Sequence, residues 1–218
     1  MNTKVVGKPS QQYNSTVVFF GKLFSFVFHP LFITIYIVSF LIFIAPGVFT
    51  GFDPRTKILR FLAVFLSTVF LPAFSVFLCW RLKLINSLYL STTKERLIPY
   101  ALTMFFYFWI WYVFRNLSDS PIVVIHLLLG SFLAICGGWM CNIFFKISMH
   151  AIAMGGLLIF ALLFAFNDSY SSGLYLSFAV LISGIVCTSR LVVSDHSSFE
   201  IYTGLIVGML AQFIAWLF

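Results

Sequence analysis

Long apolar runs separated by short polar segments constrain the fold of this chain more than any other feature. Seven runs can be traced, at about residues 24–49, 58–80, 99–114, 122–145, 151–166, 174–188 and 201–218. A helix of roughly 18 or more apolar residues is long enough to cross a bilayer. Because 61% of the 218 residues are hydrophobic and 9% are charged, a soluble fold could not bury this much apolar surface. We therefore predict an all-α, polytopic transmembrane helical bundle of about seven spans, with six as the alternative count.

The chain is expected to form one integral membrane domain over residues 1–218, with residues 1–20 as a polar or amphipathic N-terminal tail. This tail does not resemble a secretory signal peptide, because it begins polar and the apolar run after it is too long. His29 and Pro30 lie near the start of the first run, where a proline suits a first helical turn or a kink. We expect His29 to be an interfacial residue at a helix end.

The charge balance and the cysteines exclude several kinds of partner. The formal net charge of +7 suits topology signals and anionic lipid head groups. No basic patch interleaved with aromatic residues indicates nucleic acid. The four cysteines lie in or beside apolar runs without a C-x-x-C pair, so they are interpreted as buried apolar residues. We expect neither a metal nor another cofactor.

Three polar segments between the runs carry the reactive side chains. Lys94 and Arg96 lie in the first, Ser148 and His150 in the second, and the third extends over residues 189–200. Two predicted spans separate each polar segment from the next, and an even number of crossings returns the chain to the same side of the membrane. The three segments are therefore predicted to converge on one face.

Together these segments offer the groups that a phosphate site needs. Cationic side chains and the free N–H groups of helix N-termini bind a dianion. His196 and Glu200 are four residues apart, so on a helix the carboxylate can hold one imidazole nitrogen and leave the other free to attack. His150 can then serve as a general acid to the leaving oxygen.

These residues also carry a resemblance to a known family. The pattern S-R-x5-H-x3-E, formed by Ser189, Arg190, His196 and Glu200, resembles the third motif of the type 2 phosphatidic acid phosphatase superfamily, S-R-x5-H-x3-D. The tripeptide S-M-H, which ends at His150, resembles the second motif, P-S-G-H. The stretch K-E-R-L-I-P is similar in kind to the first motif, K-x6-R-P. In this chain a glutamate takes the place of the usual aspartate in the third motif.

The resemblance implies a role for each matching residue. His196 would be the nucleophile that forms a phosphohistidine, Glu200 would orient it, and His150 would protonate the leaving group. The phosphoryl oxygens would be bound by Arg190, Arg96, Lys94, Ser148 and Ser189. The family needs no metal for this chemistry.

The function expected from this reasoning is metal-independent hydrolysis of a phosphomonoester or diphosphate on a lipid. Phosphatidic acid, phosphatidylglycerol phosphate and a polyprenyl diphosphate are the candidate substrates, and membrane lipids are the surroundings. One alternative is a lipid phosphotransferase that uses the same histidine. The others are a non-catalytic lipid-binding protein and a transporter, although charges at the span ends disfavour the transporter.

The distribution of positive charge leaves open which face of the membrane carries the site. Nine Lys and Arg residues fall on the predicted site-bearing face and four on the opposite face, which together account for all 13. Three of the nine belong to the predicted site, so the remaining six against four give no clear positive-inside signal. We expect a multi-pass protein of the bacterial inner, or cytoplasmic, membrane.

Overall fold

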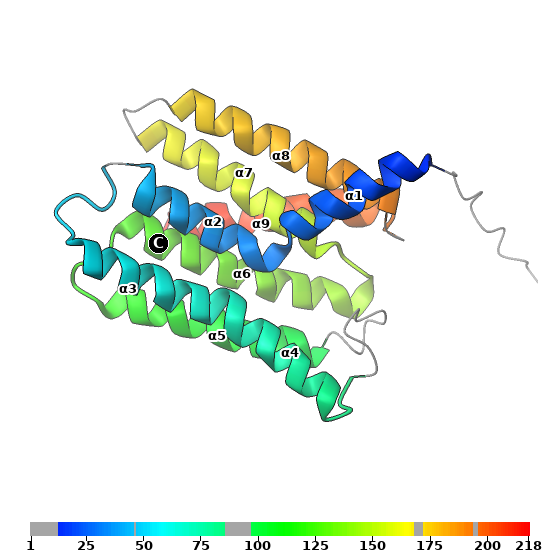
Figure 1. Ribbon diagram of the computed structural model, residues 1–218, viewed down its shortest axis with the longest axis horizontal. Coiled ribbons are helices and arrows are strands. Elements are labelled where there is room, and N and C mark those ends of the chain that lie inside the picture. The colour runs from blue at the N-terminus through cyan, green and yellow to red at the C-terminus, as the bar shows by residue number, and fades with distance from the viewer. Residues whose placement is uncertain (1–12, 46, 86–96, 168–171, 194–195) are drawn as a thin grey trace, which may run out of the picture.

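The computed structural model describes residues 13–45, 47–85, 97–167, 172–193 and 196–218, and all regular structure in these ranges is helical (Figure 1). The α-helices are α1 (Ser15–Val27), α2 (Pro30–Phe43), α3 (Pro54–Phe65), α4 (Leu71–Arg81), α5 (Leu97–Asn116), α6 (Ile122–Phe144), α7 (Met149–Asn167), α8 (Ser172–Val193) and α9 (Ser198–Trp216). A π-helical segment, Leu66–Phe70, joins α3 to α4. The predicted all-α class is confirmed.

Six of the described helices are long and apolar enough to cross a membrane. They are the continuous helix Pro54–Arg81 and the helices α5, α6, α7, α8 and α9. The helices α1 and α2 pass the same test only when taken together, and they would make a seventh span. Both span counts expected from the sequence thus remain compatible with the fold, and the chain is a multi-pass membrane protein.

The first apolar run, expected as one span over about residues 24–49 with a first turn or a kink at Pro30, is divided into two helices. It is bent by 61° between α1 and α2, and α1 already begins at Ser15, inside the segment expected to be a tail. The bend falls at His29–Pro30 because a proline has no N–H to continue the preceding helix, yet its fixed φ suits a first helical turn. Pro30 accordingly opens α2.

The π-helical segment has a local cause in Pro72. In a regular α-helix the carbonyl of Thr68 would accept the N–H of residue 72, which a proline lacks. The hydroxyl of Tyr107 in α5 donates to this carbonyl instead, at 3.3 Å. Tyr107 is 3% exposed, so a side chain from a neighbouring helix replaces the missing backbone partner in a buried place.

The closest helix packing joins α7 to α9 through glycines. A Cβ atom added to Gly208 of α9 would overlap the carbonyl oxygen of Ile152, and one added to Gly155 of α7 would overlap the carbonyl oxygen of Leu205. Small residues that allow backbones to approach are the usual basis of helix association in a membrane. This contact holds the first two turns of α7 against the middle of α9.

The helices run roughly along one direction, so the bundle has two ends. Figure 1 shows the end of α4, the start of α5, the connection α6–α7 and the end of α8 at its right end. The connections α2–α3 and α5–α6 and the end of α9 lie at the left. The described residues of the second and third polar segments therefore share one end, as the count of crossings predicts.

Candidate functional site

A cavity of about 440 Å³ lies at this end, within the size range of small-molecule sites. Its lining comes from the beginnings of α2, α5 and α7, from α4, α6 and α8, and from His196 before α9. His150, Arg190 and His196, which the sequence predicts to converge, all line it. His29 lines it as well.

His196 is held by the first turn of α9. Its Nδ1 atom lies 3.0 Å from Oε2 of Glu200. The N-cap residue Ser197 forms a reciprocal capping box with the same glutamate, since Oε2 accepts the Ser197 N–H at 2.9 Å and Ser197 Oγ accepts the Glu200 N–H at 3.3 Å. The His196 side chain is 6% exposed. Because Nδ1 is occupied by the carboxylate, Nε2 is the nitrogen that can react.

The surroundings of His196 favour its neutral form. Burial lowers the pKa of the imidazole below its ordinary value, and the charges of Arg190 and Lys146 act in the same direction. The hydrogen bond to Glu200 and the negative charge of that carboxylate raise the pKa and only partly offset the burial. A neutral imidazole with a free Nε2 is the form that a nucleophile requires.

His150 is held in a comparable way by a backbone carbonyl. Its Nε2 atom lies 2.9 Å from the oxygen of Ser25 in α1. A carbonyl only accepts, so Nε2 carries the proton in this contact and Nδ1 is left to take up or release another. The two predicted catalytic imidazoles are thus each oriented through one nitrogen, from different helices.

The cavity is electropositive. Arg190 brings the permanent charge, and none of the described residues that line the cavity is a carboxylate. The first residues of α2 and α7 line it, so the positive ends of two helix dipoles meet there, and His196 lies just before the N-cap of α9. A guanidinium, imidazoles and helix N-termini in one cavity are the arrangement that binds a phosphate.

The two serines predicted to bind phosphate lie elsewhere, and neither lines this cavity. Ser148 is fully buried, and its Oγ accepts the N–H of Ala151 at 3.5 Å in the first turn of α7. Ser189 donates to the carbonyl of Ile185 at 2.8 Å and lines a separate cleft between α1 and α8. Both residues contribute to local helix structure, and their phosphate-binding roles stay predictions.

Lys94 and Arg96, the predicted cations of the first polar segment, lie outside the described residues. They directly precede α5 in the sequence, and Pro99 and Tyr100 of its first turn line the cavity. The described part of that segment therefore reaches the site that the sequence predicts.

His29 is the residue of the cavity that sequence reasoning placed only at a helix end. It is indeed the N-cap of α2, but its ring also lies 5.4 Å from that of His150, with 82° between the planes. The signal that could have identified it is the pair His29–Pro30. A proline that forces a bend inside an apolar run brings polar backbone and a titratable side chain into the membrane interior.

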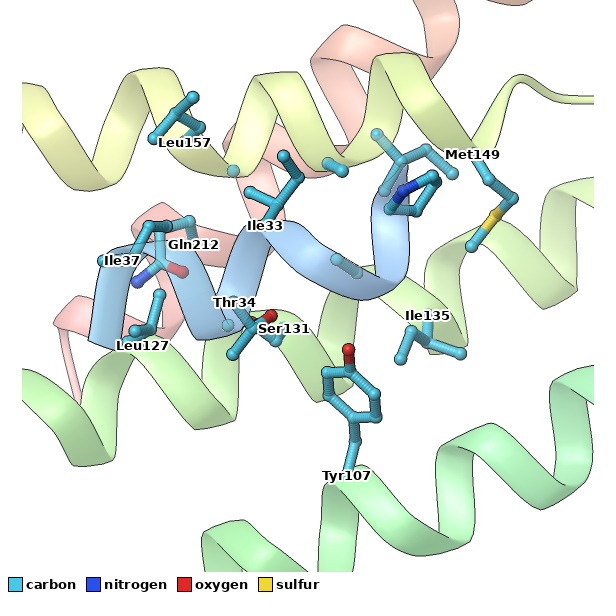
Figure 2. Close-up of a pocket in the computed structure, with 16 residues that line it drawn as sticks. Ile33, Thr34, Ile37, Tyr107, Leu127, Ser131, Ile135, Met149, Leu157 and Gln212 are labelled. Carbon is cyan, nitrogen blue, oxygen red and sulfur yellow. The ribbon is translucent and has the colours of Figure 1, made fainter. Parts of the chain in front are cut away.

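A second, smaller cavity of about 60 Å³ adjoins the first, since Pro30, Ile135 and Met149 line both. Figure 2 shows the Tyr107 hydroxyl directed into it, with Thr34 and Ser131 nearby. The hydroxyl oxygens of Thr34 and Ser131 lie 3.1 Å apart. Most residues that line this smaller cavity are apolar, and the polar side chains of its lining are those of Thr34, Tyr107, Ser131 and Gln212.

No group of three or more His, Cys, Asp or Glu side chains in the described ranges is placed to hold a metal ion. Two acceptors, Glu200 and the carbonyl of Ser25, hold the imidazoles of His196 and His150 in the cavity. No protein-family model, curated protein or solved structure matches this chain.

Proposed function

We propose that the protein is a metal-independent lipid phosphatase that works through a phosphohistidine on His196. The observation that carries the proposal is the contact between His196 and Glu200, which leaves Nε2 as the reactive nitrogen in a cavity with Arg190 and His150. The similarity of the S-R-x5-H-x3-E pattern to the phosphatidic acid phosphatase motif supports the same role. The candidate substrates remain phosphatidic acid, phosphatidylglycerol phosphate and a polyprenyl diphosphate.

In the first step, Nε2 of His196 attacks the phosphorus atom. A P–N bond forms as the bond from phosphorus to the lipid oxygen breaks. The protonated His150 donates its Nδ1 proton to that oxygen, so the lipid leaves as an alcohol, or as a monophosphate if the substrate was a diphosphate. Arg190 stabilises the charge that develops on the phosphoryl oxygens, and Lys94 and Arg96 are proposed to assist it.

In the second step, His150, now neutral at Nδ1, takes a proton from water. The hydroxide attacks the phosphohistidine, the P–N bond breaks, and inorganic phosphate leaves. His196 is restored and His150 is protonated for the next cycle. Glu200 stabilises the imidazolium-like His196 while the P–N bond exists, as the acid of a catalytic triad does.

We further propose that the protein resides in the bacterial inner membrane. Its apolar helical spans support this, because proteins that span the bacterial outer membrane are typically β-barrels. The lipid substrate would then reach the cavity from within the bilayer, between the start of α2 and α4, whose residues Leu31 and Ala73 line it.

The test is phosphate release by the purified protein in detergent, with EDTA present, over a panel of the three lipid classes. His196→Ala should abolish release, and His126→Ala, which removes a histidine outside the cavity, should retain it. Brief reaction with labelled substrate, followed by alkaline quenching, should trap an acid-labile phosphoprotein. A folded wild-type protein that releases no phosphate from any of the lipids would refute the proposal, as would full activity in His196→Ala. Transfer of the phosphoryl-bearing group to an alcohol in place of water would identify a phosphotransferase.

A further inference from the structure

The mechanism above leaves one titratable side chain of the cavity without a role. His29 lines the cavity together with His150, Arg190 and His196. It comes from the bend between α1 and α2, which lies far in the sequence from all three motifs of the resemblance. A histidine is costly in the interior of a membrane protein unless it faces polar partners or a ligand.

The backbone around His29 determines which of its nitrogens carries the proton. His29 caps α2, and its Nδ1 accepts the N–H of Leu31 at 3.4 Å. An acceptor nitrogen carries no proton, so in the neutral ring the proton resides on Nε2. Nδ1 is thus committed to the helix cap, and Nε2–H is the donor left for a ligand.

The charged and titratable neighbours of His29 among the described lining residues are all basic. Its ring meets that of His150 edge to face, at 5.4 Å between centroids, and Arg190 lines the same cavity. Among the described residues no carboxylate is part of the lining, and Glu200 contacts His196 from outside it. The Nε2–H of His29 together with the Arg190 guanidinium suits an anion with several acceptor oxygens.

We propose that His29 is a phosphate-binding residue that donates its Nε2–H to a phosphoryl oxygen of the substrate that does not react. This inference rests on the proposed function, since it assigns His29 to the same site. It also assigns a role to the 61° bend between α1 and α2. The bend ends one helix and starts the next inside the bundle, which places both the imidazole and the N-terminus of α2 at the anion.

The decisive variant is His29→Asn. Asparagine is a preferred N-cap residue, so it keeps the acceptor that α2 needs, but its shorter side chain cannot reach as the imidazole does. If His29 only caps the helix, His29→Asn is neutral. If His29 binds phosphate, the variant folds normally and loses affinity for the anion. The matched control is His126→Asn, because His126 lies in α6 outside the cavity, against Trp216.

Binding is measured in a His196→Ala background, where no turnover can occur, by calorimetric titration with inorganic phosphate and with a short-chain lipid phosphate. We expect His29→Asn to weaken both by about tenfold or more, as the loss of a charge-assisted hydrogen bond does. His126→Asn should bind as its parent does. Equal affinity in the two variants would overturn the inference, and so would the absence of phosphate binding in the parent. An unchanged melting temperature in His29→Asn separates lost contact from lost fold.

The same variants in the active protein distinguish this inference from the proposed function. With His196 present, His29→Asn should raise KM and lower kcat for a lipid phosphate. If release depends on His196 but His29→Asn binds and turns over like wild type, the phosphatase stands and the inference fails. If phosphate binding depends on His29 but no lipid is hydrolysed, the anion site stands and the phosphatase fails.

Discussion

Glu200 holds His196 through a contact of 3.0 Å between its Oε2 and the Nδ1 of the imidazole. The same oxygen accepts the N–H of Ser197 and so helps to cap α9. One carboxylate therefore contacts both the imidazole and the helix cap. Substitutions at this position can separate the two contacts, because the cap needs only an acceptor, whereas the proposed reaction needs a negative charge beside the imidazole.

Glu200→Gln should lower kcat by about 10²- to 10⁴-fold, since a neutral amide can still orient the ring but cannot stabilise a positive charge on it. Its melting temperature should change little, because the amide oxygen still caps α9. Glu200→Ala should lose both activity and about 1 kcal/mol of stability, as the loss of a cap does. Glu200→Asp, which keeps the charge, should retain or exceed wild-type activity. Wild-type kcat in Glu200→Gln would show that the carboxylate has no chemical role.

The acid limb of kcat/KM should lie below pH 6.5, because burial lowers the pKa of His196 from that value and only the neutral ring attacks. In Glu200→Gln the limb should move to still lower pH, since the hydrogen bond and charge that raise the pKa are weakened or removed. Any titration of the substrate affects both proteins equally, so the difference between their pH profiles reflects the pKa of the His196 imidazole. A limb that moves upward would contradict the assignment.

The same lowered pKa has a consequence for stability. In the unfolded chain His196 binds its proton near pH 6.5, whereas the folded protein binds it only at lower pH. The stability linked to the neutral ring is present above pH 6.5 and is lost as the pH falls through the folded pKa. The melting temperatures of wild type and His196→Gln, measured over this pH range, should converge at low pH. If the two melting temperatures declined in parallel, the link between stability and the pKa of His196 would be contradicted.

Tyr107→Phe should destabilise the protein by about 1–3 kcal/mol, because it leaves the buried carbonyl of Thr68 without the hydroxyl that donates to it. The shape of the side chain is otherwise kept, so the loss reports the hydrogen bond. Tyr202→Phe, on an exposed position of α9, is the matched control and should be neutral. Equal melting temperatures of the two variants in detergent would argue that Thr68 has another partner.

Gly208→Ala should destabilise the bundle by about 1–3 kcal/mol, because the added methyl group meets the backbone of Ile152 and α9 must move away from α7. Gly184→Ala in α8 places the same methyl group in open space and should cost nothing. Since α7 and α9 carry His150 and His196 near their first turns, Gly208→Ala should also lower kcat. A variant as stable and active as Gly184→Ala would show that this contact is not tight.

Much of the fold follows from the sequence, because a run of apolar residues indicates a membrane helix whatever its neighbours are. The starts of α6 and α9 fall within three residues of the expected positions. The bend of 61° at His29–Pro30 is one of the two outcomes expected there, since a proline near the start of a run is compatible with both a first turn and a kink. Only the packing of α1 against α8 and of α2 against α7 decides between them.

The site could be predicted in outline but not in the direction of each side chain. Counting crossings brings His150 and His196 to one end, and that count depends only on the number of spans. Which way Ser189 and Arg190 face depends on the rotation of α8, and a helix that is apolar on most sides gives little indication of it. The sequence therefore predicts both residues for the site, whereas only Arg190 reaches the cavity.

The wide turn at Leu66–Phe70 has one more consequence. It accommodates an additional residue in one turn of the helix, and each residue advances an α-helix by about 100°. The whole of α4 is thereby rotated about its own axis relative to α3, and this phase directs Ala73 and Val76 to the cavity. Removing one residue from the turn would leave a helix long enough for the bilayer but with a different strip of its surface facing the cavity. The extra residue between α3 and α4 thus sets the rotation of α4 about its axis, and this rotation determines which of its side chains line the cavity.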